Sequence, residues 1–162
     1  METKPKNKLA ETGKAILGVI ILVIMVLNIY TYFNGNKNNY NSRTERDKNI
    51  DRQLTEIASQ FNENAPFMID ENTRFDNMIA TPGKILQYNY TLVDMTKEEF
   101  DEYDEEYDYI EGTMLPMIIN QLKTHPQMER FRKMQITLRS YYRDMNGVYI
   151  TELEVTPSMY ND

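Results

Sequence analysis

The sequence contains no cysteine, and its only histidine is His125. The missing cysteines exclude disulfide bonds, thiolate catalysis, cysteine-ligated zinc and a membrane anchor on an acylated cysteine. A single histidine excludes a histidine-rich metal site, and no nucleophile elbow is present to complete a Ser-His-Asp arrangement. The sequence also has no P-loop and no G-x-G-x-x-G motif. It therefore predicts no catalytic residue, no metal site and no cofactor.

Positive charge is scarce as well. The chain of 162 residues has 18 Lys and Arg against 25 Asp and Glu, a net charge of -7 at pH 7. A general nucleic-acid-binding protein needs a basic face to neutralise phosphates, so we expect no nucleic-acid partner. The same acidity argues against the polar part of the chain lying on an anionic lipid surface. The mean hydropathy of -0.63 hides one strongly apolar segment near the N-terminus.

That segment, Ala15 to Phe33, has 19 residues and no charge. As a helix it would be about 28 Å long, close to the roughly 30 Å hydrocarbon thickness of a bilayer. Its apolar side chains would surround the whole helix, and aromatic residues gather at its C-terminal end, as at a membrane interface. No A-x-A site follows for a cleaved signal, and a buried core helix fits an N-terminal position before a tether poorly. The sequence predicts a transmembrane anchor that contacts the lipid bilayer.

The orientation of this anchor rests on two features. Basic residues are nearly balanced on its two sides, but Lys14 abuts the span and the exit side opens with neutral residues. A long acidic domain follows, and long domains cross membranes largely regardless of charge. We therefore expect a single-pass protein of the cytoplasmic (inner) membrane with its C-terminal domain outside the cytoplasm. The expected organisation is a cytoplasmic tail (1–14), a transmembrane helix (15–33), a tether (34–43) and an extracytoplasmic domain (44–162).

Periodicity predicts the elements of this domain. Apolar residues at helical spacing predict a helix over 44–61, and alternation around Pro82-Gly83 predicts two antiparallel strands, 73–80 and 84–94. Apolar residues three and four apart from Phe100 to Leu122 predict a long helix, which we expect to bend or break near Gly112. Two further strands flank Asn146-Gly147, a dipeptide favoured in tight hairpin turns. The expected fold is α+β, with a small antiparallel sheet of about four strands and two or three helices on one face.

The first candidate site is an acidic surface for a basic partner or a loosely held divalent cation. Its carboxylates fall opposite the apolar stripe of the long helix, at Glu98, Asp101, Glu102, Glu105 and Asp108. Five carboxylates on a helix do not wrap one ion, and a solvated helix face accounts for most such runs. The second candidate is Arg74 and Asp76, two residues apart on one face of a strand. They would form either an ion pair or a contact with a partner.

Other candidates have stronger structural explanations. Paired carboxylates could hydrolyse glycosidic bonds, and candidates by residue type alone are Asp70, Glu71, Asp76 and Asp94. Nothing in their spacing places two at a working separation. His125 lies at a helix end, where a cap or surface position explains it. Several tyrosines lie in the predicted strands, and we interpret them as core residues of the sheet or as members of cross-strand pairs. They are Tyr88, Tyr90, Tyr141, Tyr142 and Tyr149.

Two segments carry a family resemblance, FMIDENTRFDNMIATPGKILQYNYTLVD (67–94) and SYYRDMNGVYITELEVTP (140–157). Their Thr-Arg-x-Asp, Pro-Gly and Tyr-x-Tyr-Thr-Leu motifs and closing hairpin resemble a loose family of small bacterial exported or membrane-anchored domains of unknown function. The resemblance implies a location outside the cytoplasm and supplies no activity. Some members of that family have cysteines that are absent here, so no disulfide is expected.

Together these observations favour a non-enzymatic domain that is anchored in the membrane and binds another protein of the bacterial cell envelope. The partner contacts we expect are Arg74, Asp76, Glu98, Asp101, Glu102 and Glu105. The alternative is a membrane-anchored hydrolase or a receptor domain for a small ligand. A concave pocket with convergent carboxylates would favour that alternative, whereas a closed core with a flat, tyrosine-rich sheet face would favour protein binding.

Overall fold

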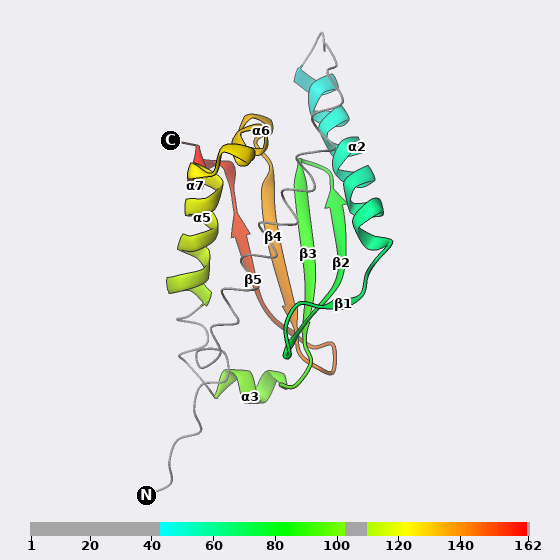
Figure 1. Cartoon of the computed structure of the whole chain (residues 1–162), viewed down its shortest axis with the longest axis vertical. Helices are drawn as coiled ribbons and strands as arrows, with labels where there is room; N and C mark the ends of the chain where they lie inside the picture. Colours follow the sequence, from blue (N-terminus) through cyan, green and yellow to red (C-terminus); the bar gives the residue numbers. More distant parts are fainter. Residues whose placement is uncertain (1–42, 103–109, 162) are drawn as a thin grey trace, which may run out of the picture.

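The structure is a computed structural model that describes residues 43–102 and 110–161 (Figure 1). The predicted membrane segment 15–33, nearly all of the tether, Glu105 and Asp108 lie outside these residues. Among the described residues, no helix combines the length and the apolar character needed to cross a bilayer.

The first described helix, α2 (Arg43–Asn62), confirms the prediction for 44–61. It buries Ile50, Leu54 and Ile57, which recur at the three- and four-residue spacing of one helix face. This stripe packs on the sheet beside strand β2. Leu54 is 0% exposed, and burial of such a side chain contributes roughly 1.5–3 kcal/mol to stability.

One five-stranded sheet, in the order β1-β2-β3-β4-β5, forms the centre of the fold (Figure 1). Its strands are β1 (Phe67–Met68), β2 (Thr73–Thr81), β3 (Ile85–Leu92), β4 (Thr137–Arg143) and β5 (Tyr149–Val155). The turn between β2 and β3 has Gly83 at a φ of 95°, the positive value expected after proline in a type II turn. The hairpin of β4 and β5 turns at Gly147, with a φ of 82°. Both predicted hairpins are therefore confirmed, and β1 is an additional strand.

The sheet is mixed, which corrects the prediction of an antiparallel sheet. β3 and β4 are parallel neighbours, and Leu86 pairs with Leu138. Parallel strands need a long crossover, and here residues 93–136 carry the chain back to the same end of the sheet. The sequence concealed this pair because β3 alternates polar and apolar residues, whereas parallel strands usually have two apolar faces.

The described parts of the crossover, residues 93–102 and 110–136, contain short helices, and the helix predicted from Phe100 ends at Asp101. Helix α3 (Lys97–Asp101) begins at a capping box formed by Thr96 and Glu99. Residues Ile110–Met114 form a π-helical turn that contains Gly112, and α5 (Leu115–Thr124) follows. The predicted irregularity near Gly112 is thus confirmed. The crossover ends with a 3-10 turn (Pro126–Met128) and α6 (Glu129–Met134), and α7 (Pro157–Tyr160) follows β5.

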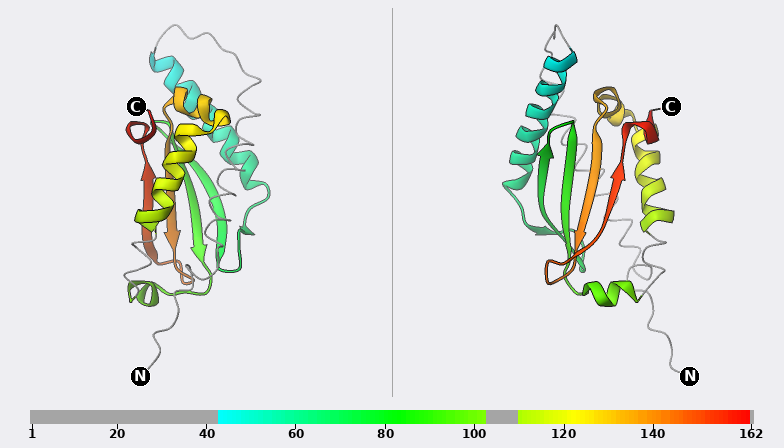
Figure 2. Two further views of the ribbon diagram at one scale, coloured as in Figure 1. Left: turned by 60° about the vertical axis from the view of Figure 1, so that its left-hand side comes forward. Right: turned by 180° about the vertical axis from the view of Figure 1, so that it is seen from behind.

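The strand register divides the sheet into an apolar and a polar face. Phe75, Tyr90 and Tyr142 are aligned on neighbouring strands and share the face that also carries Leu86 and Leu138. Helices α2 and α5 contribute their buried residues to the core on this apolar face. Figure 2 shows the sheet and these helices from two further directions. The prediction of helices on one face is confirmed, and helices α2 and α5 leave the other face of the sheet uncovered.

Candidate protein-binding surface

The polar face is the side of the sheet that points away from α2 and α5. The strand register places on it residues that are almost all polar or aromatic, namely Arg74, Asp76, Asn77, Gln87, Asn89, Thr91, Arg139, Tyr141, Arg143, Glu152 and Glu154. Most of these side chains bond to a neighbour on the next strand. The face is therefore a set of fixed cross-strand groups rather than a layer of independent side chains.

Arg74 and Asp76, which the sequence singled out, are joined on this face. Arg74 Nε donates a hydrogen bond to Asp76 Oδ1 at 2.6 Å, and Thr91 Oγ1 donates to Asp76 Oδ2 at 2.5 Å. The two side chains share a face because they are two residues apart on β2, and a β-bulge between Phe75 and Asn77 brings Asn77 onto the same face. The side chains are 42% and 22% exposed, so the pair can be reached from solvent. The ion-pair reading of these residues is confirmed.

A chain of amides lies beside this pair. Gln87 Nε2 donates to Asn89 Oδ1 at 2.8 Å, and Asn89 Nδ2 donates to Asn77 Oδ1 at 2.7 Å. Asn89 is only 8% exposed, and its amide uses both its oxygen and its nitrogen in these bonds. A buried polar group that is fully bonded has a defined orientation. The amides therefore present fixed donors and acceptors at the surface.

Arg139 and Glu154 form a second ion pair on the neighbouring strands. Arg139 Nη2 and Nε donate to the same Glu154 oxygen, at 2.6 and 3.1 Å. This hydrogen bonding raises the pKa of the Arg139 guanidinium above its ordinary value. Both side chains remain partly exposed, and exposed pairs stabilise a fold by only about 0.2–1 kcal/mol. The pair contributes more to the order of the face than to stability.

Tyrosines occupy the end of the face beside the β4–β5 hairpin. The rings of Tyr141 and Tyr149 lie 5.0 Å apart, and the Arg143 guanidinium carbon lies 5.2 Å from the centre of the Tyr141 ring. Burial, and then the charge of Glu152, raises the pKa of Tyr149. Tyr88 and Tyr90, by contrast, are buried on the apolar face. The prediction of cross-strand pairs and core tyrosines holds.

Among the described residues, the acidic side chains of the predicted long helix, Glu98, Asp101 and Glu102, are not joined to the Arg74 pair. Glu98 and Glu102 are exposed, and Asp101 forms an ion pair with Lys97 one turn away at 2.5 Å. Among the described residues, no group of carboxylates and histidines is arranged to hold a metal ion. Helix α3 nevertheless follows directly after β3, so its carboxylates lie at the same end of the sheet as Arg74.

The remaining candidates have structural roles. Asp70 Oδ1 accepts hydrogen bonds from the backbone N–H groups of Asn72 and Thr73, both at 2.8 Å, and thereby closes the turn before β2. Asp94 accepts a bond from the Asn72 side chain. His125 is the C-cap of α5, and its backbone N–H donates a hydrogen bond to the backbone oxygen of Gln121 at 3.0 Å. The cap position agrees with the structural explanation of His125.

No family model matches the chain, and no curated protein sequence matches it significantly. Solved structures share its fold. One is a protein of Pseudomonas aeruginosa that is provisionally classed as secreted, with a TM-score of 0.56 and 8% identity over 72% of this chain and 96% of the other. Another is the pilotin EpsS of the Vibrio vulnificus type 2 secretion system, with a TM-score of 0.53 and 10% identity over 74% of this chain and 99% of the other. At this identity the likeness concerns the fold alone.

Proposed function

We propose that the chain is a non-enzymatic accessory protein of the bacterial cell envelope, whose domain binds another envelope protein through the polar face. The observation that carries this proposal is the fixed pattern of cross-strand groups on a sheet face that the described helices leave uncovered. Side chains already held by neighbours lose little freedom on binding, which favours recognition of a preformed surface. The fold shared with a pilotin and with a protein classed as secreted supports a place in the envelope.

The contact centre in this proposal is the pair Arg74 and Asp76. Arg74 remains partly exposed although it is paired with Asp76, and its Nη2 also donates a hydrogen bond to Thr91 Oγ1 at 3.4 Å. A partner carboxylate can reach the guanidinium without breaking the internal pair, because guanidinium has five donors. The exposed carboxylates of Glu98 in α3 and of Glu102, its C-cap, supply a rim of opposite charge at the same end.

The proposal includes the membrane anchor. Residues 15–33 would hold the domain at the cytoplasmic membrane, with the domain outside the cytoplasm, and the family resemblance of 67–157 points to the same side. A charged residue at the centre of a membrane helix opposes insertion by about 2.5–3.5 kcal/mol. Ile24→Arg should therefore move the full-length protein from the membrane pellet to the aqueous fraction, whereas Ile24→Leu should leave it in the pellet. Wild-type protein in the aqueous fraction would contradict the anchor.

Photocrosslinking in the native cell tests the binding surface. A photoreactive amino acid replaces Asn77, which is exposed on the polar face, and a control chain carries it at Met159 of α7. We expect an adduct with one envelope protein from position 77, and its loss when Arg74→Glu is added. Adducts only between copies of the chain, or equal adducts from both positions, would contradict the proposal.

The side of the membrane is tested separately. Because the chain has no cysteine, a cysteine introduced at Asn161 would be its only thiol. We expect a membrane-impermeant maleimide to label it in intact cells whose outer layers are permeable to the reagent. Labelling only after lysis would place the domain in the cytoplasm.

A further inference from the structure

Three exposed apolar side chains gather at the turn between β4 and β5. Met145, Val148 and Tyr149 are 53%, 50% and 44% exposed. Single exposed apolar residues are ordinary on a protein surface, whereas exposed apolar residues that lie together are typical of protein interaction sites. We call this turn, residues 143–149, the hairpin tip.

The hairpin tip is held rigidly by a buried carboxylate. Asp144 is 1% exposed, and its Oδ1 accepts hydrogen bonds from the N–H groups of Asn146 and Val148 at 2.8 and 2.7 Å. Its Oδ2 accepts a bond from the N–H of Lys97 at 3.0 Å, so the turn is fixed to the start of α3. The exposed apolar side chains are therefore presented in one conformation before any partner binds, which reduces the entropy lost on binding.

Arg143 adds an available positive charge to the tip. The other arginines that we placed on the polar face, Arg74 and Arg139, are paired with Asp76 and Glu154. Arg143 is exposed and forms no ion pair within the described part of the chain, and its guanidinium lies over the ring of Tyr141. Stacking on an aromatic ring leaves the in-plane N–H donors of a guanidinium open to a carboxylate.

We propose that the hairpin tip, together with Tyr141, binds a segment of another protein that presents an aspartate or glutamate beside an apolar side chain. The carboxylate pairs with Arg143, and the apolar side chain packs on Val148 and Tyr149. Arginine and tyrosine around a desolvated centre are the residues that dominate protein interfaces. This inference rests on the proposed function and deepens it, because it names the chemistry of the partner.

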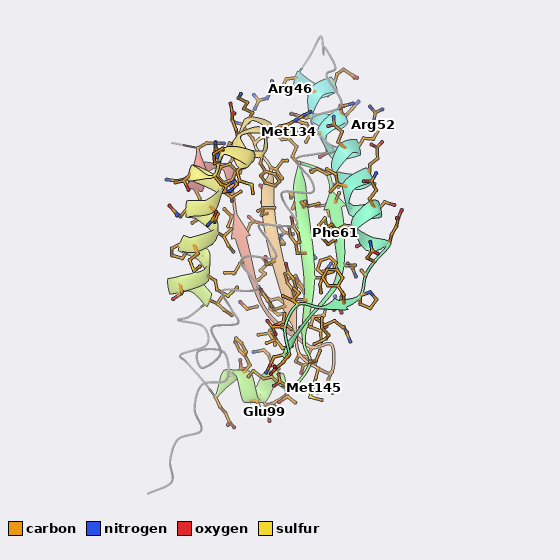
Figure 3. All side chains as sticks on the ribbon, viewed as in Figure 1. Arg46, Arg52, Phe61, Glu99, Met134 and Met145 are labelled. Carbon is orange, nitrogen blue, oxygen red and sulfur yellow. The ribbon has the colours of Figure 1, made fainter. Side chains whose placement is uncertain are left out.

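The position of the tip in the domain favours a protein partner over a lipid surface. Met145 and Arg46 of the first turn of α2 lie at opposite ends of the domain (Figure 3). In the proposed arrangement the tether joins the membrane anchor to the start of α2. The tip is then at the end farthest from the point of attachment.

A random 12-residue peptide library displayed on phage and selected on the full-length protein in lipid nanodiscs tests this inference. We expect selected peptides to be enriched in Asp or Glu next to an apolar residue. A fluorescein-labelled copy of the most frequent peptide should bind the wild type and lose about tenfold or more in affinity with Arg143→Gln and with Val148→Ser. Met159 is an exposed apolar residue on α7, outside the hairpin tip. The control variant Met159→Ser should therefore change the affinity less than about twofold.

The contrary outcomes are equally distinct. No enrichment, or peptides that bind Arg143→Gln as well as the wild type, would overturn the inference. Quenching of a bimane label on Val148→Cys by spin-labelled lipids in the same nanodiscs would show that the tip lies in lipid and would overturn it too. If either result came together with an Arg74-dependent crosslink from position 77, only the inference about the hairpin tip would fail, and the proposed function would still hold.

Discussion

The side chain of Asn62, the last residue of α2, forms two hydrogen bonds with the backbone of Met78. Asn62 Nδ2 donates to Met78 O, and Met78 N donates to Asn62 Oδ1, both at 2.8 Å. Strand β1 pairs with β2 at Phe75 and Arg74, and beyond them the outer edge of β2 has no neighbouring strand among the described residues. The Asn62 amide takes the place of a strand at Met78, and it thereby protects a free edge of the sheet.

Removal of this amide should lower the stability of the domain. Asn62→Ala leaves the N–H and C=O of Met78 without their partner, and we expect the free energy of unfolding to fall by about 1–2 kcal/mol. Asn64→Ala is the control, because Asn64 is exposed and should change stability by less than about 0.5 kcal/mol. Urea titrations followed by circular dichroism measure both. Equal losses for the two variants would contradict the role given to Asn62.

The carboxylate of Asp144 should make the domain sensitive to acid. Burial by itself would raise the pKa of Asp144, but hydrogen bonds from the N–H groups of Val148, Lys97 and Asn146 outweigh it and lower the pKa below its ordinary value. A lowered pKa in the folded state stabilises the fold above the ordinary carboxyl pKa of about 4, and this contribution is lost as the pH falls through the folded-state value.

Thermal unfolding from pH 3 to pH 7 tests this expectation. The difference in Tm between the wild type and Asp144→Asn should be constant above about pH 5 and should shrink at lower pH. Asp51→Asn is the comparison variant, because the Asp51 carboxylate of α2 also accepts hydrogen bonds from backbone N–H groups, those of Gly83 and Lys84 in the turn between β2 and β3. A difference for Asp144→Asn that does not vary with pH would show that the carboxylate charge is not responsible.

Two buried tyrosines should respond differently to loss of the hydroxyl. The Tyr88 hydroxyl is buried and has no hydrogen-bond partner in the described part of the chain, whereas the Tyr160 hydroxyl donates to Ile136 O. Tyr88→Phe should leave the free energy of unfolding unchanged or increase it, because an unpaired polar group is removed. Tyr160→Phe should lower it by about 1–2 kcal/mol. Denaturant titrations of the two variants decide the matter, and a larger loss for Tyr88→Phe would refute this account.

The tyrosines of the apolar face should limit stability in alkali. Burial raises the pKa values of Tyr88, Tyr90 and Tyr142. A raised pKa in the folded state leaves stability intact below the ordinary tyrosine pKa of about 10, and stability falls as the pH rises beyond it. The ultraviolet absorbance of tyrosinate, followed as the pH is raised, should show that some of the tyrosines ionise only when the domain unfolds. Complete ionisation of a still folded domain would contradict this burial.

The ion pair of Arg139 and Glu154 should be weak despite its short distance. A double-mutant cycle with Arg139→Met and Glu154→Gln should give a coupling energy of about 0.2–1 kcal/mol, because both side chains are partly exposed. The coupling should shrink further in about 1 M salt, where the screening length is about 3 Å. A coupling well above this range would mean that the polar face is more strongly desolvated than these exposures indicate.

Local patterns predicted most of the elements. Ile50, Leu54 and Ile57 marked α2, and Pro82-Gly83 and Asn146-Gly147 marked the two hairpins, because helix period and turn chemistry act over a few residues. The capping box of Thr96 and Glu99 is equally local, because its two residues are three apart in the sequence. The pair of Arg74 and Asp76 could be predicted for the same reason, because residues two apart on a strand share a face.

Other features depend on residues that are far apart in the sequence. The parallel pairing of β3 with β4, the amide chain from Asn77 to Gln87 and the bonds of Asp144 to Lys97 all join separate elements. The sequence around Asn146-Gly147 did hold one unused signal, because Met145, Val148 and Tyr149 are apolar residues at a turn that is usually polar. Whether they were exposed could be decided only by the position of the hairpin.

Helix starts, hairpin turns and the alternation of apolar and polar residues in the strands could be predicted from the sequence. These features depend on backbone preferences and on the spacing of apolar side chains. Three features follow from the tertiary structure instead: β3 lies beside β4 in parallel, the polar side chains of four strands meet on one face, and Arg143 lies over Tyr141 with no ion pair among the described residues. Those relationships arise from the register of strands brought together by a long crossover, and no local pattern encodes that register.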